Sequence, residues 1–270
     1  MNLRPSAFDE IIGQHKAVSQ LTISVKSVNT RNDVFSHLLL TGPPGLGKTT
    51  LATALTKEIA LSNGANIGSL KQILPYIMRL GQGDVLFIDE IHRLSAKVQE
   101  FLFPVMEDFR VDLSDAKTTE SIEIPKFTLI GATTEGGNLL APLRDRFVFK
   151  IALSLYTDEE LFCILDINKD KLEVGINDDA LKSVARRSRG TPRIANNHLL
   201  WLRDYGVAHD IDNICQAEVD KAMDIIGVDK EGRTIQDRKY LKTLAEIITK
   251  TGNPVGLATL VSSSNIDKDT

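Results

Sequence analysis

Eight residues, GPPGLGKT from Gly42 to Thr49, have the types and spacing of a loop that binds the phosphates of a nucleotide. Glycines such as Gly45 and Gly47 let backbone amides surround phosphates, and the helix start that follows adds its positive dipole end. Lys48 would neutralise charge on the β- and γ-phosphates, and the Thr49 hydroxyl would hold Mg²⁺. The loop lies between an apolar run and a helical pattern, as this motif requires. The sequence therefore predicts a nucleoside triphosphate site with magnesium.

A second motif, LFIDE from Leu86 to Glu90, supplies the carboxylates that hydrolysis of such a nucleotide needs. The apolar residues carry Asp89 to the end of a buried strand, where it would contact the Mg²⁺ shell. Glu90 would then polarise the attacking water. Acidic residues can also simply end a strand, but together with the phosphate loop this pair favours phosphoanhydride hydrolysis.

Two further segments could complete the site. Thr133 and Thr134 end an apolar run, and either hydroxyl could sense the γ-phosphate or merely cap the next turn. The sequence does not separate these two threonines. The segment LRDRF, Leu143 to Phe147, contains arginines that could reach the nucleotide of a neighbouring subunit. Those arginines could instead form a surface salt-bridge cluster through Asp145.

The densest basic stretch, RRSRGTPR from Arg186 to Arg193, has three interpretations. It could contact nucleic acid, or it could end a helix in solvent, where the helix dipole favours positive charge. A third interpretation places Arg193 over the nucleotide. Elsewhere, His92 has no second histidine at ligand spacing, so we do not expect a zinc site there.

The elements that would position these residues alternate between strands and helices in the first half of the chain. This alternation is typical of a parallel sheet covered by helices. We expect a helix from Lys48 to Ala60 after the phosphate loop and a small hairpin from Val111 to Ile124. Near-continuous apolar runs, which suit strands buried on both faces, are found at His37–Thr41, Asp84–Asp89, Phe127–Ala132 and Val148–Leu153.

From Thr157 onwards the patterns are helical only. Thr157 and Glu160 fit a capping box, in which each side chain satisfies a free amide at a helix start. We therefore place a domain boundary near Leu155. Later helices are expected to end near Gly190, to run from Pro192 to about Tyr205, and to run from about Ile235 to Lys250.

Composition excludes several classes of protein. The net charge of −4 is not that of a protein whose whole surface grips nucleic acid, although a local basic strip can still do so. Cys163 and Cys215 lack metal-ligand spacing, and no apolar run reaches the roughly 20 residues needed to cross a bilayer. The N-terminus lacks the apolar core of a secretory signal. These features predict a cytoplasmic protein with no membrane segment.

Taken together, the motifs resemble RuvB, a family of AAA+ ATPases that drive branch migration of Holliday junctions. The resemblance runs from Leu3 to about Leu260. PLRDRF from Pro142 and RRSRGTPRIAN from Arg186 separate this family from most other AAA+ proteins. The other matching stretches are LRP at 3–5, IIGQ at 11–14, GPPGLGKTTLA from 42, LFIDEIHRLS from 86, MEDF from 106 and TLIGATT from 128.

The resemblance implies a role for each matching position. Residues that would act in hydrolysis are Lys48, Asp89, Glu90, Thr133 or Thr134, Arg146 and Arg193, with Mg²⁺ held by Thr49 and Asp89. Residues that would bind ATP are Leu3, Arg4, Ile11 and Ile12 beside the adenine, Gly45, Gly47, Lys48, Thr49 and Thr50 at the phosphates, and Glu107, Asp108 and Phe109 elsewhere at the nucleotide. Arg146 would be a finger that acts across subunits. Tyr156 and Arg193 would close a lid domain onto the nucleotide, with Arg193 as the second sensor.

The resemblance also implies an architecture and partners. An α/β AAA+ P-loop domain with a parallel sheet core would span residues 1–155, an all-α lid domain 156–228, and a truncated winged-helix segment 229–270. The chain would form a homo-oligomeric ring, expected to be a hexamer. It would act on the DNA of a four-way junction in recombination and repair, with a RuvA-like junction-binding partner.

Three segments depart from the family pattern. Residues 61–83 form a shorter stretch that has lost most of a recognisable strand, and the tip of the hairpin is shortened. The winged-helix segment lacks its later helix and its wing, which in the family meet DNA. This last departure motivates an alternative, a degenerate AAA+ module for nucleotide-dependent assembly or regulation that no longer translocates DNA. A clamp-loader-like ATPase is a third reading, against which the RuvB-type lid sequence argues.

Overall fold

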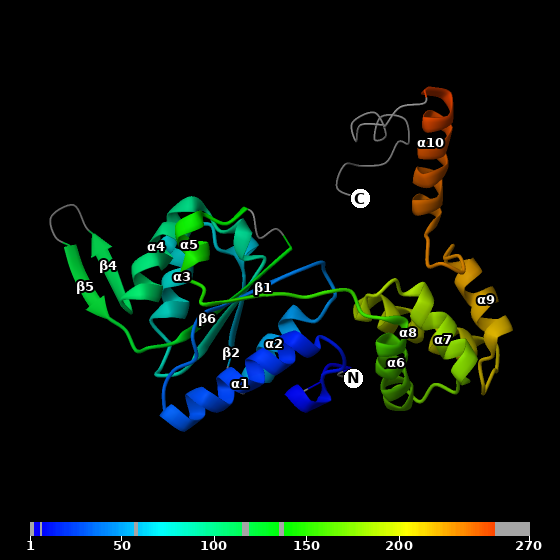
Figure 1. Cartoon of the computed structure of the whole chain (residues 1–270), viewed down its shortest axis with the longest axis horizontal. Coiled ribbons are helices and arrows are strands. Elements are labelled where there is room, and N and C mark those ends of the chain that lie inside the picture. The colour runs from blue at the N-terminus through cyan, green and yellow to red at the C-terminus, as the bar shows by residue number, and fades with distance from the viewer. Residues whose placement is uncertain (1–2, 6, 57–58, 115–118, 135–137, 252–270) are drawn as a thin grey trace. The chain divides into compact units, whose positions relative to one another are not determined.

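The computed structural model describes residues 3–5, 7–56, 59–114, 119–134 and 138–251 (Figure 1). The chain divides into two compact units between Leu155 and Tyr156. The first is an α/β unit and the second is helical. No helix within the described residues is long and apolar enough to cross a membrane.

The first unit is built around a parallel sheet. Within the described residues its strands are ordered β2-β3-β6-β1-β7, and every neighbouring pair is parallel. Their bounds are Leu38–Thr41 (β1), Ile59–Asn63 (β2), Val85–Asp89 (β3), Thr128–Thr133 (β6) and Phe149–Ala152 (β7). The apolar runs predicted as strands are thus confirmed as β1, β3, β6 and β7. β1, β3 and β6 are almost wholly buried, which explains their continuous apolar character.

Helices cover both faces of this sheet. Helices α1 (His15–Arg31) and α2 (Lys48–Leu55) lie on one side (Figure 1). Helices α3 (Leu70–Ile77), α4 (Ala96–Glu107) and α5 (Ala141–Asp145) lie on the other side and share a buried apolar cluster with the strands. Short 3₁₀ turns are η1 (Phe8–Glu10), η2 (Gly64–Asn66) and η3 (Ile91–Arg93).

The predicted hairpin is present as an antiparallel pair, β4 (Arg110–Ser114) and β5 (Thr119–Glu123). Val111 pairs with Ile122 and is fully buried, so it is one point at which the hairpin base joins the core. The shortened tip lies outside the described residues.

One predicted boundary is wrong. The helix after the phosphate loop ends at Leu55 and not at Ala60, and Ile59 and Ala60 belong to β2. Ile59 pairs with Val85 and Ala60 with Leu86, so the ladder with the buried strand β3 decides the conformation of this segment. The strand that we expected to be mostly lost between 61 and 83 is therefore present and begins two residues earlier, at the edge of the sheet.

The second unit contains helices α6 to α10. The predicted capping box is confirmed at α6, because Glu160 N donates to Thr157 Oγ1 (3.2 Å) and Thr157 N donates to Glu160 Oε2 (2.9 Å). The helix bounds are Asp158–Lys171 (α6), Asp178–Arg187 (α7), Pro192–Ala208 (α8), Gln216–Ile225 (α9) and Ile235–Thr251 (α10). Helix α10 is the first helix expected in the winged-helix segment 229–270, and residues 252–270 of that segment lie outside the described residues.

Candidate nucleotide site

The phosphate loop joins β1 to α2 in backbone conformations that favour glycine. Gly42, Gly45 and Gly47 have φ values of +136°, +84° and +95°. A Cβ on Gly42 would also lie 2.8 Å from the carbonyl oxygen of Leu153. Gly47 directly precedes α2, whose first turn therefore presents backbone amides toward the loop. The sequence thus folds here into a concave, amide-lined turn at a helix start, which is suited to an anion.

Lys48 is held inside this loop. Its side chain is largely buried, at 7% exposure. Its Nζ donates to the carbonyl oxygens of Gly42 (2.8 Å) and Pro43 (3.0 Å). The ammonium is therefore positioned by the loop itself, where phosphate oxygens would compete with those carbonyls. Thr49 and Thr50 follow in the first turn of α2 and are half-buried.

The acidic pair, Asp89 and Glu90, lies at the carboxyl end of β3, two strands from β1 in the sheet. Asp89 is the last residue of β3, and Glu90 adopts the left-handed conformation with φ +48°. Glu90 N donates to Asp89 Oδ1 at 3.0 Å, which fixes the turn between the two carboxylates. β3, β6 and β1 are consecutive in the sheet, so their carboxyl ends bring the acidic pair, the threonines and the phosphate loop to one edge.

The structure separates the two threonines that the sequence could not. Thr133 pairs with Thr41 across β6 and β1, and its carbonyl accepts a hydrogen bond from Gly42 N (3.2 Å). Thr133 is fully buried, and its hydroxyl lies 2.8 Å from His92 Nδ1. Thr134, the next residue, is exposed. The two hydroxyls therefore have different surroundings.

The sequence did not predict the contacts of His92, which lies in η3 directly after the acidic pair. Its Nδ1 is 3.3 Å from Glu90 Oε2 and 2.8 Å from Thr133 Oγ1. Glu90 Oε2 is buried, and within the described residues no hydrogen bond of good geometry reaches it. The signal in the sequence is the spacing of two residues between Glu90 and His92, which brings the two side chains together across one 3₁₀ turn.

The segment expected beside the adenine lies at the same edge. η1 contacts α2, and Ile11 and Ile12, both half-buried, directly follow η1. The side-chain amide of Gln14 makes two hydrogen bonds to the backbone of Ser154. Gln14 Nε2 donates to Ser154 O (2.6 Å), and Ser154 N donates to Gln14 Oε1 (3.2 Å). Ser154 follows Leu153, whose amide donates to the carbonyl oxygen of Thr41 (2.8 Å), the residue before Gly42. Of the remaining predicted residues here, Leu3 is half-buried and Arg4 is exposed.

A second group of predicted residues lies at the other end of the strands, by their amino ends. Glu107, Asp108 and Phe109 follow from the end of α4, and Arg146 directly follows α5. His37, which immediately precedes β1, accepts a hydrogen bond from Leu129 N at Nδ1 (2.8 Å) and meets Met106 O through Nε2 (3.0 Å). This holds the end of α4 against the amino ends of β1 and β6. Burial lowers the pKa of His37, which favours the neutral ring that these bonds require.

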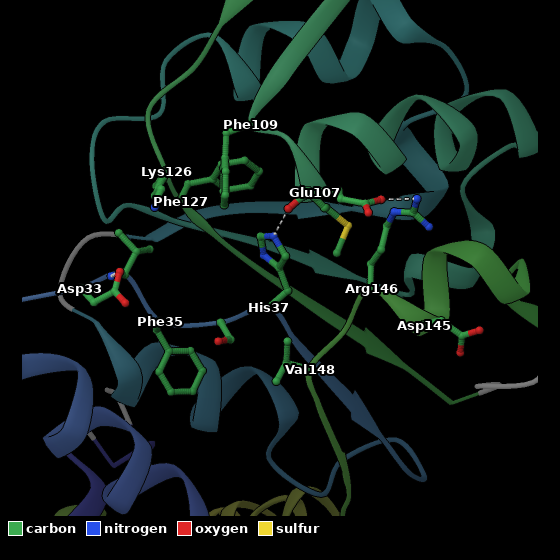
Figure 2. A pocket seen from close by; sticks show the side chains of 13 residues that line it. Asp33, Phe35, His37, Glu107, Phe109, Lys126, Phe127, Asp145, Arg146 and Val148 are labelled. Atoms are coloured by element: carbon green, nitrogen blue, oxygen red, sulfur yellow. Dashed lines mark hydrogen bonds and ion pairs between the residues drawn. The ribbon is translucent and has the colours of Figure 1, made fainter. Parts of the chain in front are cut away.

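Arg146 is held firmly in this second group. Its Nη2 lies 2.5 Å from Glu107 Oε2, and its Nη1 donates to the carbonyl oxygen of Pro142 at 2.7 Å. Its guanidinium also lies 4.8 Å from the ring centroid of Phe103. Arg146 and Glu107 both line a pocket of about 410 Å³. Figure 2 shows Glu107 and Arg146 directed toward one another, with Asp145 pointing away. Asp145 pairs with Lys150 instead (3.4 Å), so the salt-bridge cluster expected through Asp145 does not include Arg146.

The structure therefore does not bring Arg146 or Glu107 to the phosphate loop of their own chain. The phosphate loop, Asp89 and Thr133 follow the carboxyl ends of the strands, whereas Arg146 and Glu107 lie by the amino ends. Strand β1 alone, from Leu38 to Thr41, spans about 10 Å at the usual rise per residue. The predicted site residues of one chain thus lie in two groups, one at the carboxyl ends and one at the amino ends of its strands.

The basic stretch of the second unit is largely neutralised internally. Arg187 is buried at 2% exposure and pairs with Asp220 (2.5 Å), whose pKa this hydrogen bond lowers. Arg189 pairs with Asp237 at 3.0 Å. Arg193 is exposed at the start of α8. Tyr156 is buried, and its amide donates to Gly190 O (2.9 Å), in the turn just before α8. The interpretation of the whole stretch as a nucleic-acid contact is therefore wrong for Arg187.

Comparisons with known proteins agree with this architecture. The model of the Holliday junction DNA helicase RuvB P-loop domain matches residues 3–153, and the model of the RuvB AAA lid domain matches residues 156–229. The chain is 40% identical to the Holliday junction branch migration complex subunit RuvB of Rhodopirellula baltica, with 100% of this chain and 75% of the relative covered. It is 42% identical to the same subunit of Kosmotoga olearia, with 99% and 80% covered.

Solved structures give the same result. The Thermotoga maritima RuvB Holliday junction branch migration motor superposes with a TM-score of 0.88 at 40% identity, and the match covers 99% of this chain and 87% of that chain. A point variant of the same Thermotoga protein superposes with a TM-score of 0.89 at 39% identity, covering 100% and 87%. The matched models, the two relatives and the shared fold together place this chain in the RuvB family of AAA+ ATPases.

Proposed function

We propose that this chain is an ATP-driven motor that moves the branch point of Holliday junctions. The observation that carries the proposal is the gathering of the phosphate loop, Lys48 and the Asp89–Glu90 pair at one sheet edge, in a chain of the RuvB family. The chain is accordingly an ATPase. Its relatives are named as subunits of the branch migration complex.

ATP and magnesium fit the groups that this edge offers. The amides from Gly45 to Thr50 and the Lys48 ammonium supply positive charge for the phosphates. Thr49 and Asp89 supply a hydroxyl and a carboxylate, the hard oxygen ligands that Mg²⁺ prefers, and both are half-buried at this edge. Bound there, Mg²⁺ would neutralise phosphate charge during hydrolysis.

We assign to Glu90 the activation of the attacking water. In hydrolysis the water oxygen bonds to the γ-phosphorus, the bond to the β-γ bridging oxygen breaks, and a proton leaves the water. The carboxylate of Glu90 can accept that proton. Thr133 uses its buried hydroxyl at His92, so we assign the role of γ-phosphate sensor to the exposed Thr134.

The separation of the two groups of residues supports a site shared between subunits. Arg146 cannot reach the phosphate loop of its own chain from the amino ends of the strands, but it can reach that of a neighbour stacked head to tail. Glu107 and Pro142 hold it in position, and Asp108 and Phe109 would meet the same neighbouring nucleotide. Head-to-tail contacts of this kind close into rings, and we propose a hexamer.

The remaining roles concern the base and the lid. Leu3, Arg4, Ile11 and Ile12 would surround the adenine, since the latter two follow η1 beside α2. Tyr156 and Arg193 lie around the turn that starts α8. We propose that they contact the nucleotide from the lid, with Arg193 as the second sensor. Lid movement would then couple hydrolysis to the pulling of duplex DNA.

We infer that the partners are four-way junction DNA and a RuvA-like junction-binding protein, in the cytoplasm where chromosomal DNA is recombined. The decisive experiment measures ATP hydrolysis by the purified chain alone, with junction DNA, and with junction DNA plus a RuvA-like protein. We expect each addition to raise turnover. Hydrolysis that responds to neither addition would favour the degenerate module, which the family match does not favour.

A further inference from the structure

One ring nitrogen lies between two residues at the site of hydrolysis. His92 Nδ1 is 2.8 Å from Thr133 Oγ1 and 3.3 Å from Glu90 Oε2. The His92 and Glu90 side chains are 13% and 29% exposed, so water screens their interaction only in part. The contact therefore joins the proposed base to the buried end of β6.

The chemistry of these groups selects one tautomer. An ionised carboxylate only accepts hydrogen bonds, whereas an imidazole nitrogen either donates or accepts. A lone pair on His92 Nδ1 would face the buried Glu90 Oε2, to which no hydrogen bond of good geometry is directed within the described part of the chain. A proton on Nδ1 instead points positive partial charge toward two oxygens, Thr133 Oγ1 at 2.8 Å and Glu90 Oε2 at 3.3 Å. Thr133 can accept from the same proton or turn its own hydrogen elsewhere.

Thr133 extends this contact to the phosphate loop. Its carbonyl accepts from Gly42 N (3.2 Å), and Gly42 O in turn accepts from Lys48 Nζ (2.8 Å). Hydrogen bonds thus connect Lys48 to Thr133 and Thr133 to His92 Nδ1, and the 3.3 Å contact of the same nitrogen extends this path to Glu90. Each step joins neighbouring groups at the carboxyl ends of β1, β6 and β3.

We propose that His92 is a positioning residue for the hydrolysis reaction, which holds the Glu90 carboxylate through Nδ1 and links it to Thr133 beside the phosphate loop. This inference rests on the proposed function, because it gives Glu90 the role of base. His92 itself touches neither nucleotide nor water in this role. Its contribution is the orientation of the base, which affects turnover and not the affinity for ATP.

Three substitutions test the position of the nitrogen. His92→Asn places an amide where Nδ1 lies, His92→Gln places one near Nε2 instead, and His92→Ala provides neither. Hydrogen bonds at catalytic groups are often long without substrate and tighten when it binds, and one to a charged group is typically worth about tenfold or more in an equilibrium. We expect kcat to fall roughly tenfold or more in the alanine and glutamine variants and to stay within about threefold of the wild type in the asparagine variant.

Two further measurements separate positioning from folding. Affinity for a non-hydrolysable ATP analogue, adenylyl imidodiphosphate, should stay within about twofold in all variants, and thermal melting should report intact folding. In a Glu90→Gln background, His92→Ala should cause no further loss of turnover, because the two residues act through one another.

The outcomes are distinguishable. Equal loss in the asparagine, glutamine and alanine variants would overturn the assignment to Nδ1, as would unchanged turnover in His92→Ala or a further loss in the Glu90→Gln background. Loss of analogue binding in parallel with turnover would show a structural role instead. Failure of the proposed function would appear separately, as a wild-type chain that hydrolyses no ATP.

Discussion

Two inactive variants should restore each other's activity when they are mixed. Lys48→Ala removes the ammonium at the carboxyl edge of the sheet, and Arg146→Ala removes the guanidinium at the amino edge. If one nucleotide site uses the loop of one chain and the arginine of the next, each variant alone has no complete site. In a mixed ring, an Arg146→Ala chain can offer its intact loop to the intact arginine of a Lys48→Ala neighbour.

The expected size of this rescue follows from the arrangement. Loss of a finger arginine costs about 10³-fold or more, so the residual rate of the Arg146→Ala chain is negligible. In a random one-to-one mixture, about half of the loops are intact and about half of the neighbouring arginines are intact. The product is roughly one quarter of the interfaces, so the mixture should regain about one quarter of wild-type turnover per chain if sites act independently.

The control mixture is wild type with the double variant Lys48→Ala/Arg146→Ala. A site shared between chains predicts about one quarter of wild-type turnover here also. A site within one chain predicts about half for this control and none for the complementing pair. The rate of the complementing mixture divided by that of the control is therefore near one for a shared site and near zero for a site within one chain. Both rates are measured by steady-state phosphate release after co-assembly. A ratio near zero would refute the shared site, even if coupling between subunits lowers both rates.

Three further outcomes are expected. Glu90→Gln should retain ATP but hydrolyse it at least about 10²-fold more slowly in single-turnover assays, and unchanged turnover would remove Glu90 from its role. Gly42→Ala should weaken ATP binding in titrations far more than Gly83→Ala, because both have positive φ but only the Gly42 methyl would meet a backbone oxygen, at 2.8 Å; equal effects would contradict this. Burial lowers the pKa of His198 to about 4 from 6.5. Between pH 6.5 and pH 4, His198 is therefore protonated in the unfolded chain but still neutral in the folded chain, which favours unfolding. The free energy of unfolding, measured by urea denaturation, should therefore fall by up to about 3 kcal/mol between pH 6.5 and pH 4. In His198→Gln much of this fall should be absent.

The parts of the fold that could be predicted are those whose signal is local. The phosphate loop combines required glycines with a lysine at fixed spacing, and buried parallel strands such as β3 are continuous apolar runs. β2 escaped prediction because its mixed residues, Ile59–Asn63, become a strand only through pairing with β3. Helix α1 was missed because within it only Ala17 and Leu21 are buried, which leaves a weak apolar stripe.

The site could be predicted to the level of motifs but not of contacts. The acidic pair follows from the sequence, but the use of the Thr133 hydroxyl at His92 depends on how β6 and η3 pack. Likewise, Glu107 and Arg146 are 39 residues apart, and nothing in either motif reveals their ion pair. Arg187 belongs to the motif that suggested nucleic acid, yet tertiary contact with Asp220 buries it. Such pairings arise from topology, which periodicity does not encode.

The central claim is that ATP hydrolysis by this chain moves junction branch points. The most direct measurement follows a labelled four-way junction as it is resolved into duplexes by the chain, ATP, magnesium and a RuvA-like protein. We expect product to accumulate with the wild-type chain and to be absent with Glu90→Gln, although that variant still binds ATP. Hydrolysis without any movement of the junction, at saturating partner and DNA, would contradict the account.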